Sequence, residues 1–302
     1  MKNKQFLASQ SLGEYHESVM VDEAVRELHV KKGSLYIDAT LGTGGHCLEM
    51  INKGGRVLGI DADLKMIEVA EKRLKDLKNI KLVHGNFVRI DEIAKENDFP
   101  AVNGILFDLG VSNVHLKDRE RGFSFENPDA ELDMRLDPEA QSVKAADLLN
   151  VLREDQLEDL FAVTLDPGVA KWITGRVLHS RAAKPISTIA DLLEICEGLK
   201  TGKTGLREGT LPFLALRIAV NSELDNLREA LLKAFGLLNH GGRLVIISFH
   251  SKEDEIVKKF FKEKNLRQQA CLTTFKPIVA EESEISVNRR ARSAKMRVLE
   301  KI

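Results

Sequence analysis

The feature that most constrains the fold is an apolar run that ends in an acid and leads into a helical pattern, repeated near the start of the chain. Three such runs end at or near Asp38, Asp61 and Asp108, and a further apolar run occupies residues 80–87. Strands that alternate with helices of about ten residues are typical of a parallel, doubly wound sheet. Because both faces of such strands are buried, they are apolar throughout. The sequence therefore predicts an α/β fold.

The alternation breaks after the fourth apolar run. Residues 117–211 contain helical patterns but no convincing strand, and strand character returns at 241–250. We therefore predict one parallel sheet formed by residues 1–116 and 212–302, with a helical domain of residues 117–211 inserted after its fourth strand. A single long helix is expected over residues 211–238. A helix and two weak strands complete the chain, at 251–264, 271–276 and 295–299.

Composition excludes several classes of protein. The chain has 302 residues, a net charge of −1 and 43% hydrophobic residues, which is ordinary for a globular protein and unlike a disordered one. No apolar run reaches the roughly 18 residues that a membrane span needs, and the N-terminus lacks the apolar segment of a signal peptide. The three cysteines are too widely spaced for a disulfide framework or a metal cluster. These features predict a cytoplasmic protein with no metal and no membrane partner.

The turn after the first predicted strand is rich in glycine, at residues 42–45. Glycine lets the backbone approach a ligand closely, and the free N–H groups of the helix that follows favour an anionic group. Asp61 lies 19 residues after Gly42, a spacing that suits an acid binding two ribose hydroxyls. A nicotinamide dinucleotide would need a further glycine where this chain has Cys47, whereas S-adenosylmethionine needs no pyrophosphate cradle. A purely structural turn is the third interpretation.

Asp108 ends the fourth predicted strand, where the ligand of an open α/β sheet binds. Methyl transfer from a sulfonium is an in-line displacement, so catalysis depends largely on positioning. An acceptor amino group conjugated with a ring would be a poor nucleophile, and a carboxylate that accepts its N–H acts mainly in the transition state. Asp108 is the candidate for that role. Holding the cofactor or capping the next turn are its alternatives.

Two further segments carry candidate residues. His250 could line a substrate pocket, while Ser251 and Asp254 have the spacing of a helix cap, and no nucleophile elbow of a serine hydrolase is present. The last 17 residues carry six basic side chains against Glu300, which is typical of a solvated tail or of a phosphate-contacting edge. The six are Arg289, Arg290, Arg292, Lys295, Arg297 and Lys301.

Nine motifs follow one another along the chain: GTGGH, IDAD, HGNF, DLGVSN, RGFSF, LDMRLD, RIAVNSEL, ISFHSKED and NRRARSAKMR. Together they resemble the bacterial MraW/RsmH-type methyltransferases from about Tyr15 to Arg297. The resemblance implies a class I, Rossmann-like methyltransferase sheet with an inserted helical domain that recognises substrate. It also implies methyl transfer from S-adenosylmethionine to the N4 amino group of a cytidine in the decoding region of 16S rRNA.

The resemblance also implies a set of site residues by motif match. Cofactor contacts fall on Gly44, Gly45, His46, Asp61, Phe87, Asp108 and His115. Phe87 would stack on adenine, with a core aromatic as its alternative, and His115 would make a polar contact, with a surface histidine as its alternative. Arg121 and Arg135 would face the substrate, either binding phosphate or pairing with neighbouring acids.

The implied partner is 16S rRNA or the small ribosomal subunit. The oligomeric state stays open, a homodimer included. Two other functions compete with methyl transfer: a nicotinamide-dependent dehydrogenase, and a non-catalytic RNA-binding factor of ribosome assembly. The sheet-end acids Asp61 and Asp108 argue against the non-catalytic factor, because RNA binding alone does not require acids at this position.

Overall fold

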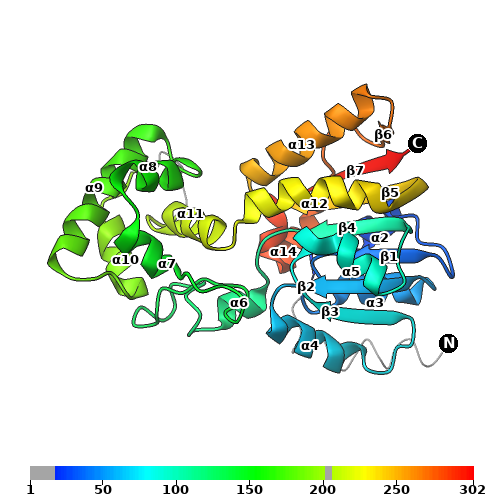
Figure 1. Cartoon of the computed structure of the whole chain (residues 1–302), viewed down its shortest axis with the longest axis horizontal. Coiled ribbons are helices and arrows are strands. Elements are labelled where there is room, and N and C mark those ends of the chain that lie inside the picture. Colours follow the sequence, from blue (N-terminus) through cyan, green and yellow to red (C-terminus); the bar gives the residue numbers. More distant parts are fainter. Residues whose placement is uncertain (1–17, 201–205) are drawn as a thin grey trace. The chain divides into compact units, whose positions relative to one another are not determined.

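The structure, a computed structural model, describes residues 18–200 and 206–302. The N-terminal segment discussed above, including Tyr15, lies outside the described residues. The chain divides into two compact units (Figure 1): one runs to Ser112 and resumes at Asn226–Ile302, and the other is Asn113–Asp225. The expected insertion of residues 117–211 falls inside the second unit. Its role in recognising substrate stays a prediction.

A seven-stranded sheet forms the centre of the first unit, in the order β3-β2-β1-β4-β5-β7-β6. Its strands are β1 (Leu35–Asp38), β2 (Arg56–Asp61), β3 (Ile80–His84), β4 (Val102–Asp108), β5 (Leu238–Ser248), β6 (Ala270–Leu272) and β7 (Lys295–Lys301). The first five strands in this order pair in parallel. The α/β fold class is thus confirmed.

The prediction of a wholly parallel sheet was wrong at one edge. Strand β7 lies between β5 and β6 and is antiparallel to both. Strand β6 therefore runs parallel to β5, and the last strand of the chain inserts between them in the opposite direction. An apolar run indicates a strand but carries no information about its direction, so the sequence pattern could not reveal this.

Helices cover both faces of the sheet. Successive strand residues point to opposite faces, so Tyr36 and Ile37 of β1 belong to different cores. One core packs α2 (Val21–Glu27), α3 (Gly45–Asn52) and α4 (Leu64–Leu74) against the sheet. The other packs α5 (Ile90–Glu96), α12 (Glu223–Leu237) and α13 (Ser251–Leu266). Burial on both sides explains why the strands are apolar throughout.

The predicted long helix over residues 211–238 was wrong, because two helices, α11 (Thr210–Val220) and α12, occupy this range. The chain turns at Asn221 and Ser222, and Ser222 has a φ of 50°, in the left-handed region. The buried Asn221 side chain donates a 2.8 Å hydrogen bond to the carbonyl of Met134, which holds the turn. Apolar periodicity continues through both helices, and neither glycine nor proline marks the break.

The second unit is mainly helical. Before α11 it contains α6 (Asn113–Lys117), α7 (Ala145–Val151), α8 (Glu154–Ala162), α9 (Pro167–Ala183) and α10 (Ile189–Cys196). Its helix starts follow known capping rules: Thr188 accepts a hydrogen bond from the Asp191 N–H at the start of α10, and Pro167 opens α9. Within the described ranges of the chain, no helix combines the length and apolar character needed to cross a membrane.

Candidate active site

Three acids gather at the carboxyl edge of the sheet. Asp38, Asp61 and Asp108 end β1, β2 and β4, which are neighbours in the order β2-β1-β4. Two short elements complete this edge: α14 (Glu282–Val287) and the 3-10 helix η2 (Arg289–Ser293). An open α/β sheet binds its ligand at the carboxyl ends of the strands. The predicted grouping of the acids at one edge is therefore present in the structure.

The glycine loop is tied directly to Asp61. The N–H of Gly42 donates to Asp61 Oδ2 at 2.7 Å, and the N–H of Asp63 donates to Oδ1 at 2.9 Å. Gly42 and Gly44 have φ values of 52° and 80°, which suit glycine and few other residues. These bonds fix both the loop and the orientation of the carboxylate.

Packing also favours glycine at two positions of this loop, because a larger residue would displace a neighbouring side chain. A Cβ at Gly44 would lie 2.7 Å from Leu74 Cδ1, and a Cβ at Gly45 would collide with the side chain of Ser18. A Cβ at Gly42 would meet nothing within 4 Å among the described residues. The structural interpretation of the turn thus accounts for Gly44 and Gly45, and the open space lies beside Gly42. The contact of Gly44 and Gly45 with a cofactor stays a prediction.

Asp38 is a fully buried acid that organises the ends of β1 and β4. The Cys47 thiol donates to Asp38 Oδ2 at 3.4 Å, and the Thr40 N–H donates to Oδ1 at 3.3 Å. The Thr40 hydroxyl oxygen in turn accepts the Asp108 N–H at 2.6 Å. Burial raises the pKa of Asp38 to about 7, and the nearby charge of Asp61 adds to this rise. In the sequence Asp38 is recognisable only as a strand end, and its link through Thr40 to the Asp108 backbone appears only in the structure.

Asp108 has an unsatisfied oxygen. Its Oδ1 atom is shielded from solvent and has no hydrogen-bond partner among the described residues, although its side chain as a whole is 19% exposed. Burial raises the pKa of Asp108 to about 8, the positive charge of Arg290 opposes this, and Asp38, Glu253 and Glu284 add to it. A buried acceptor without a partner is costly in a folded protein. The geometry thus leaves Asp108 ready to receive an N–H or a cation.

His46, in the first turn of α3, is a neighbour of Asp108. Its ring is buried, with Nε2 3.0 Å from the carbonyl oxygen of Val19 and Nδ1 4.0 Å from Asp108 Oδ2. Burial lowers the pKa of His46 to about 4, so the imidazole is neutral at physiological pH. Nε2 then carries the hydrogen and donates it to Val19. The predicted cofactor contact of His46 stays a prediction, and the structure shows that the ring touches Asp108.

Two residues that act on Asp108, Arg290 and Glu284, could not be recognised as site residues from the sequence. Arg290 stacks its guanidinium over the Phe249 ring, 5.3 Å from the centroid, and donates to the carbonyl oxygen of Val111. Glu284 accepts the N–H of Met20 at 2.8 Å. Both act on the pKa of Asp108. No spacing rule connects residues this far apart in sequence. Arg290 belongs to the NRRARSAKMR motif, but the sequence indicated it only as part of a basic C-terminal segment.

The cap of α13 differs from the expectation. His250, not Ser251, is the N-cap, and Glu253 accepts hydrogen bonds from the N–H groups of Phe249 and His250 at 2.9 and 3.2 Å. Asp254 pairs instead with Arg297, with Nε 2.6 Å from Oδ1. The predicted capping by Ser251 and Asp254 was therefore wrong. The reason is a helix start one residue earlier, which moves the third helical position to Glu253.

Phe87 and His115 lie in different units. Phe87 begins the 3-10 helix η1 (Phe87–Arg89) and packs edge-on against Phe107, with centroids 5.5 Å apart. It is partly buried against the sheet core. His115 belongs to α6 in the second unit and is buried against the Phe123 ring at 5.3 Å. It is therefore not a surface histidine, and cofactor contacts for both residues stay predictions.

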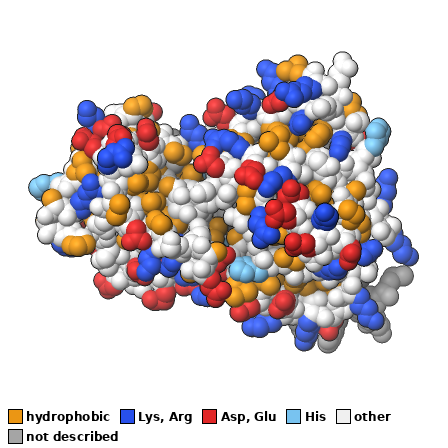
Figure 2. Space-filling view, viewed as in Figure 1, with side chains coloured by type: hydrophobic (Ala, Val, Ile, Leu, Met, Phe, Trp, Pro, Cys, Tyr) orange, Lys and Arg blue, Asp and Glu red, His pale blue; other side chains and the backbone are white. Residues whose placement is uncertain are grey.

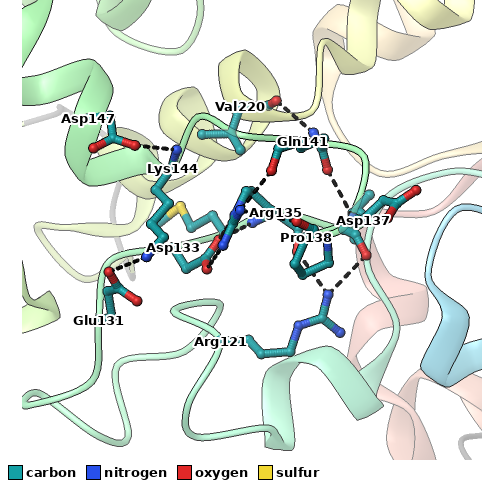
Figure 3. Close-up of polar contacts among 12 residues, drawn as sticks. Arg121, Glu131, Asp133, Arg135, Asp137, Pro138, Gln141, Lys144, Asp147 and Val220 are labelled. Atoms are coloured by element: carbon teal, nitrogen blue, oxygen red, sulfur yellow. Dashed lines mark hydrogen bonds and ion pairs between the residues drawn. The ribbon is translucent and has the colours of Figure 1, made fainter.

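The LDMRLD motif forms a closed polar network within the second unit (Figure 3). Arg135 donates from Nε and Nη2 to both oxygens of Asp133 at 2.7 Å, and from Nη1 to the carbonyls of Pro138 and Gln141. Its side chain is only 13% exposed. Arg121 donates to the carbonyls of residues 135 and 136 at 2.8 and 3.0 Å. Of the two interpretations offered for Arg135, pairing with a neighbouring acid therefore describes the structure.

The RGFSF motif has a matching structural reason. Gly122 has a φ of 74°, and a Cβ at this position would lie 2.8 Å from the backbone of both Glu131 and Asp133. Met134, between Asp133 and Arg135, also has a left-handed φ, of 65°. The two motifs thus pack backbone against backbone.

Comparisons with known proteins agree along almost the whole chain. A family model described as the MraW methylase family matches residues 13–302. Ribosomal RNA small subunit methyltransferase H of Caldicellulosiruptor bescii is 37% identical, over 95% of this chain and 99% of that relative. The protein of the same name from Dehalococcoides mccartyi is 40% identical, over 95% and 86%. Among solved structures, an rRNA methylase from Streptococcus thermophilus aligns over 94% of this chain and 95% of that chain, with 13% identity and a TM-score of 0.43.

Proposed function

The chain belongs to the MraW methylase family, and from this premise we propose that it transfers a methyl group from S-adenosylmethionine to the N4 amino group of a cytidine in the decoding region of 16S rRNA. The family assignment removes the dehydrogenase alternative. The observation that carries the chemical part of the proposal is the shielded Oδ1 of Asp108, which has no partner among the described residues at the ligand-binding edge of the sheet.

The residues of this edge fit S-adenosylmethionine. Asp61 is held in place by two backbone N–H groups at the end of β2, and it is the proposed acceptor for the ribose hydroxyls. The start of α3, just after the glycine loop, favours a carboxylate. Bound there, S-adenosylmethionine supplies an electrophilic methyl group on a positively charged sulfur. Asp108 is the acid at this edge that can offset such a charge, because its Oδ1 is otherwise unsatisfied.

Asp108 has a second task in the proposed reaction. The lone pair of the cytosine amino nitrogen is delocalised into the ring, so the nitrogen attacks well only as it becomes tetrahedral. A carboxylate that accepts its N–H stabilises that change and takes the proton released after transfer. The raised pKa of Asp108 matches a proton acceptor that works near neutral pH. Target bases in structured RNA must leave the stack to reach such a group.

Methyl transfer can be tested with purified protein, labelled S-adenosylmethionine and small-subunit RNA or ribosomal subunits. We expect label in the RNA that depends on the protein and is lost in Asp108→Asn. Binding of the RNA with no transfer of label, under conditions where the cofactor also binds, would favour the assembly-factor alternative. The cytoplasmic location stays a prediction.

A further inference from the structure

The six basic side chains of the C-terminal segment have different environments. Arg290 is engaged by Phe249 and Val111, as described above. Arg297 is paired with Asp254 through two bonds, of 2.6 and 3.1 Å. Lys301 donates to carbonyls at the end of α12, the shortest bond being 2.6 Å to Leu238. These three cations are therefore bonded to other groups of the protein itself. The segment is not a uniform charged tail.

Arg292 and Lys295 differ from these three. Both are exposed, and they line a groove of about 250 Å³ together with Phe249, Ser251 and Ser293. No acidic side chain is among the residues that line it. Arg289, although exposed, does not line the groove either. Two cations and two hydroxyl groups around a small hollow are the donors that an oxyanion needs.

Asp254 forms an ion pair with Lys295 but offsets its charge only in part. Asp254 Oδ2 lies 3.8 Å from the Lys295 ammonium, beyond hydrogen-bond distance. Both oxygens of Asp254 already accept from the Arg297 guanidinium, and this pairing holds the pKa of Asp254 below its usual range even though burial raises it. Lys295 therefore keeps its donors for another acceptor.

The groove lies at the same edge of the sheet as Asp108. Asp108 of β4 pairs in register with Ile247 of β5, and Phe249 and Ser251 follow directly after that strand. Arg290 connects the two places, because it covers Phe249 and contacts Val111 three residues after Asp108. All these residues belong to the first unit.

The face shown in Figure 2 carries acidic and basic side chains interspersed over the first unit, in line with the net charge of −1. With a net charge of −1 the protein has no strong overall attraction for a polyanion, so RNA binding depends on local groups.

We propose that Arg292 and Lys295 bind one backbone phosphodiester of the RNA strand that presents the target cytidine to Asp108. This inference rests on the proposed function. The groove offers cationic and hydroxyl donors suited to a phosphate. Contacts to the backbone position the strand without reading its sequence. Because both cations hold one phosphate, their removal should be non-additive. Each single variant should therefore weaken RNA binding almost as much as the double variant does.

Binding of an RNA fragment from the small subunit, measured at several salt concentrations, tests the proposal. We expect Arg292→Ala, Lys295→Ala and the double variant each to raise the RNA Kd by about five- to tenfold, and to reduce the slope of log K against log salt by about 1. The Kd for S-adenosylmethionine alone should not change. A matched control is Lys259→Ala with Lys262→Ala, which removes the same charge from exposed positions of α13.

Three results would overturn the proposed phosphate site. The first is an unchanged RNA Kd and salt slope, and the second is an equal effect of the control pair. The third is fully additive single variants with a slope change of about 2, because that result indicates two separate phosphates. Unchanged melting temperatures exclude misfolding as the cause. The proposed function is judged separately. Wild-type protein that binds RNA with the expected salt dependence, but transfers no methyl group, would overturn the reaction and leave the groove supported.

Discussion

His46 Nδ1 lies 4.0 Å from Asp108 Oδ2, while the other ring nitrogen of His46 is committed to the carbonyl of Val19. The imidazole is therefore a neutral neighbour of the acid, and it supplies no charge to stabilise a carboxylate. Arg290 lowers the pKa of Asp108, but burial outweighs it. Without a ligand, the surroundings of Asp108 thus favour its protonated form. A cation bound beside it favours the carboxylate.

Replacing Asp108 by Asn should affect turnover far more than cofactor binding. The amide keeps the size of the side chain but cannot take up the proton of the amino group, so we expect single-turnover rates to fall by about 10²-fold or more. The Kd for S-adenosylmethionine, measured by calorimetry, should rise less than tenfold. Equal losses in both quantities would make Asp108 a cofactor ligand only.

Replacing Asp61 by Ala should weaken cofactor binding. The change removes the proposed acceptor for ribose hydroxyls and also releases the Gly42 N–H, so we expect the Kd to rise by about 10- to 100-fold. Calorimetry with S-adenosylmethionine measures this. Asp76→Ala, at an exposed position of the same unit, is the control and should bind normally. Unchanged affinity in Asp61→Ala would reject the assignment.

Stability should depend on pH through the same groups. The pKa values of Asp38 and Asp108 are raised by folding, so their contribution is fully present below about pH 4 and is lost as the pH rises through 7 to 8. The pKa of His46 is lowered, so its contribution is present above pH 6.5 and is lost toward pH 4. Of these three groups, only the two acids change the free energy of unfolding between pH 6.5 and 8. The free energy of unfolding of the cofactor-free protein should then fall by about 1–2 kcal/mol per acid.

Urea unfolding of the wild type and of Asp108→Asn across this pH range checks the prediction. The variant should show a shallower decline, because one of the two acids is gone. Parallel pH profiles for the two proteins would show that Asp108 is already ionised at pH 6.5.

Replacing Arg135 by Ala should destabilise the second unit without changing the salt dependence of RNA binding. The variant leaves Asp133 without its bidentate partner in a site where Arg135 is only 13% exposed, and we expect a loss of about 2–4 kcal/mol. Thermal unfolding gives the loss. Arg135→Lys should restore little of it, because an ammonium cannot reproduce the fork. A stable variant with a reduced salt slope would instead assign Arg135 to phosphate binding.

The sequence predicted the sheet well because its signals are local. Apolar runs, strand-end acids and the glycine turn depend on neighbours in the chain, and Asp38, Asp61 and Asp108 meet at one edge as that pattern requires. The direction of β7 and the break at Asn221 depend on tertiary partners. So does the environment of Asp108, to which Arg290 and Glu284 come from the far end of the chain.

Capping and pairing were harder to predict, for a related reason. The choice of His250 as the cap of α13 depends on where the backbone leaves β5, and a shift of one residue exchanged the roles of Glu253 and Asp254. Arg135 lies among acids in the sequence, so pairing and phosphate binding looked alike until the distances were known.

The central claim is that this chain methylates one cytidine at N4 through Asp108. Mass spectrometric mapping of small-subunit RNA, from cells with the gene, without it, and with only the Asp108→Asn variant, tests the claim most directly. We expect an N4-methyl group on one decoding-region cytidine that is present in the first RNA and absent or strongly reduced in the other two. The same modification in all three RNAs, or its loss at a nucleotide other than cytidine, would contradict it.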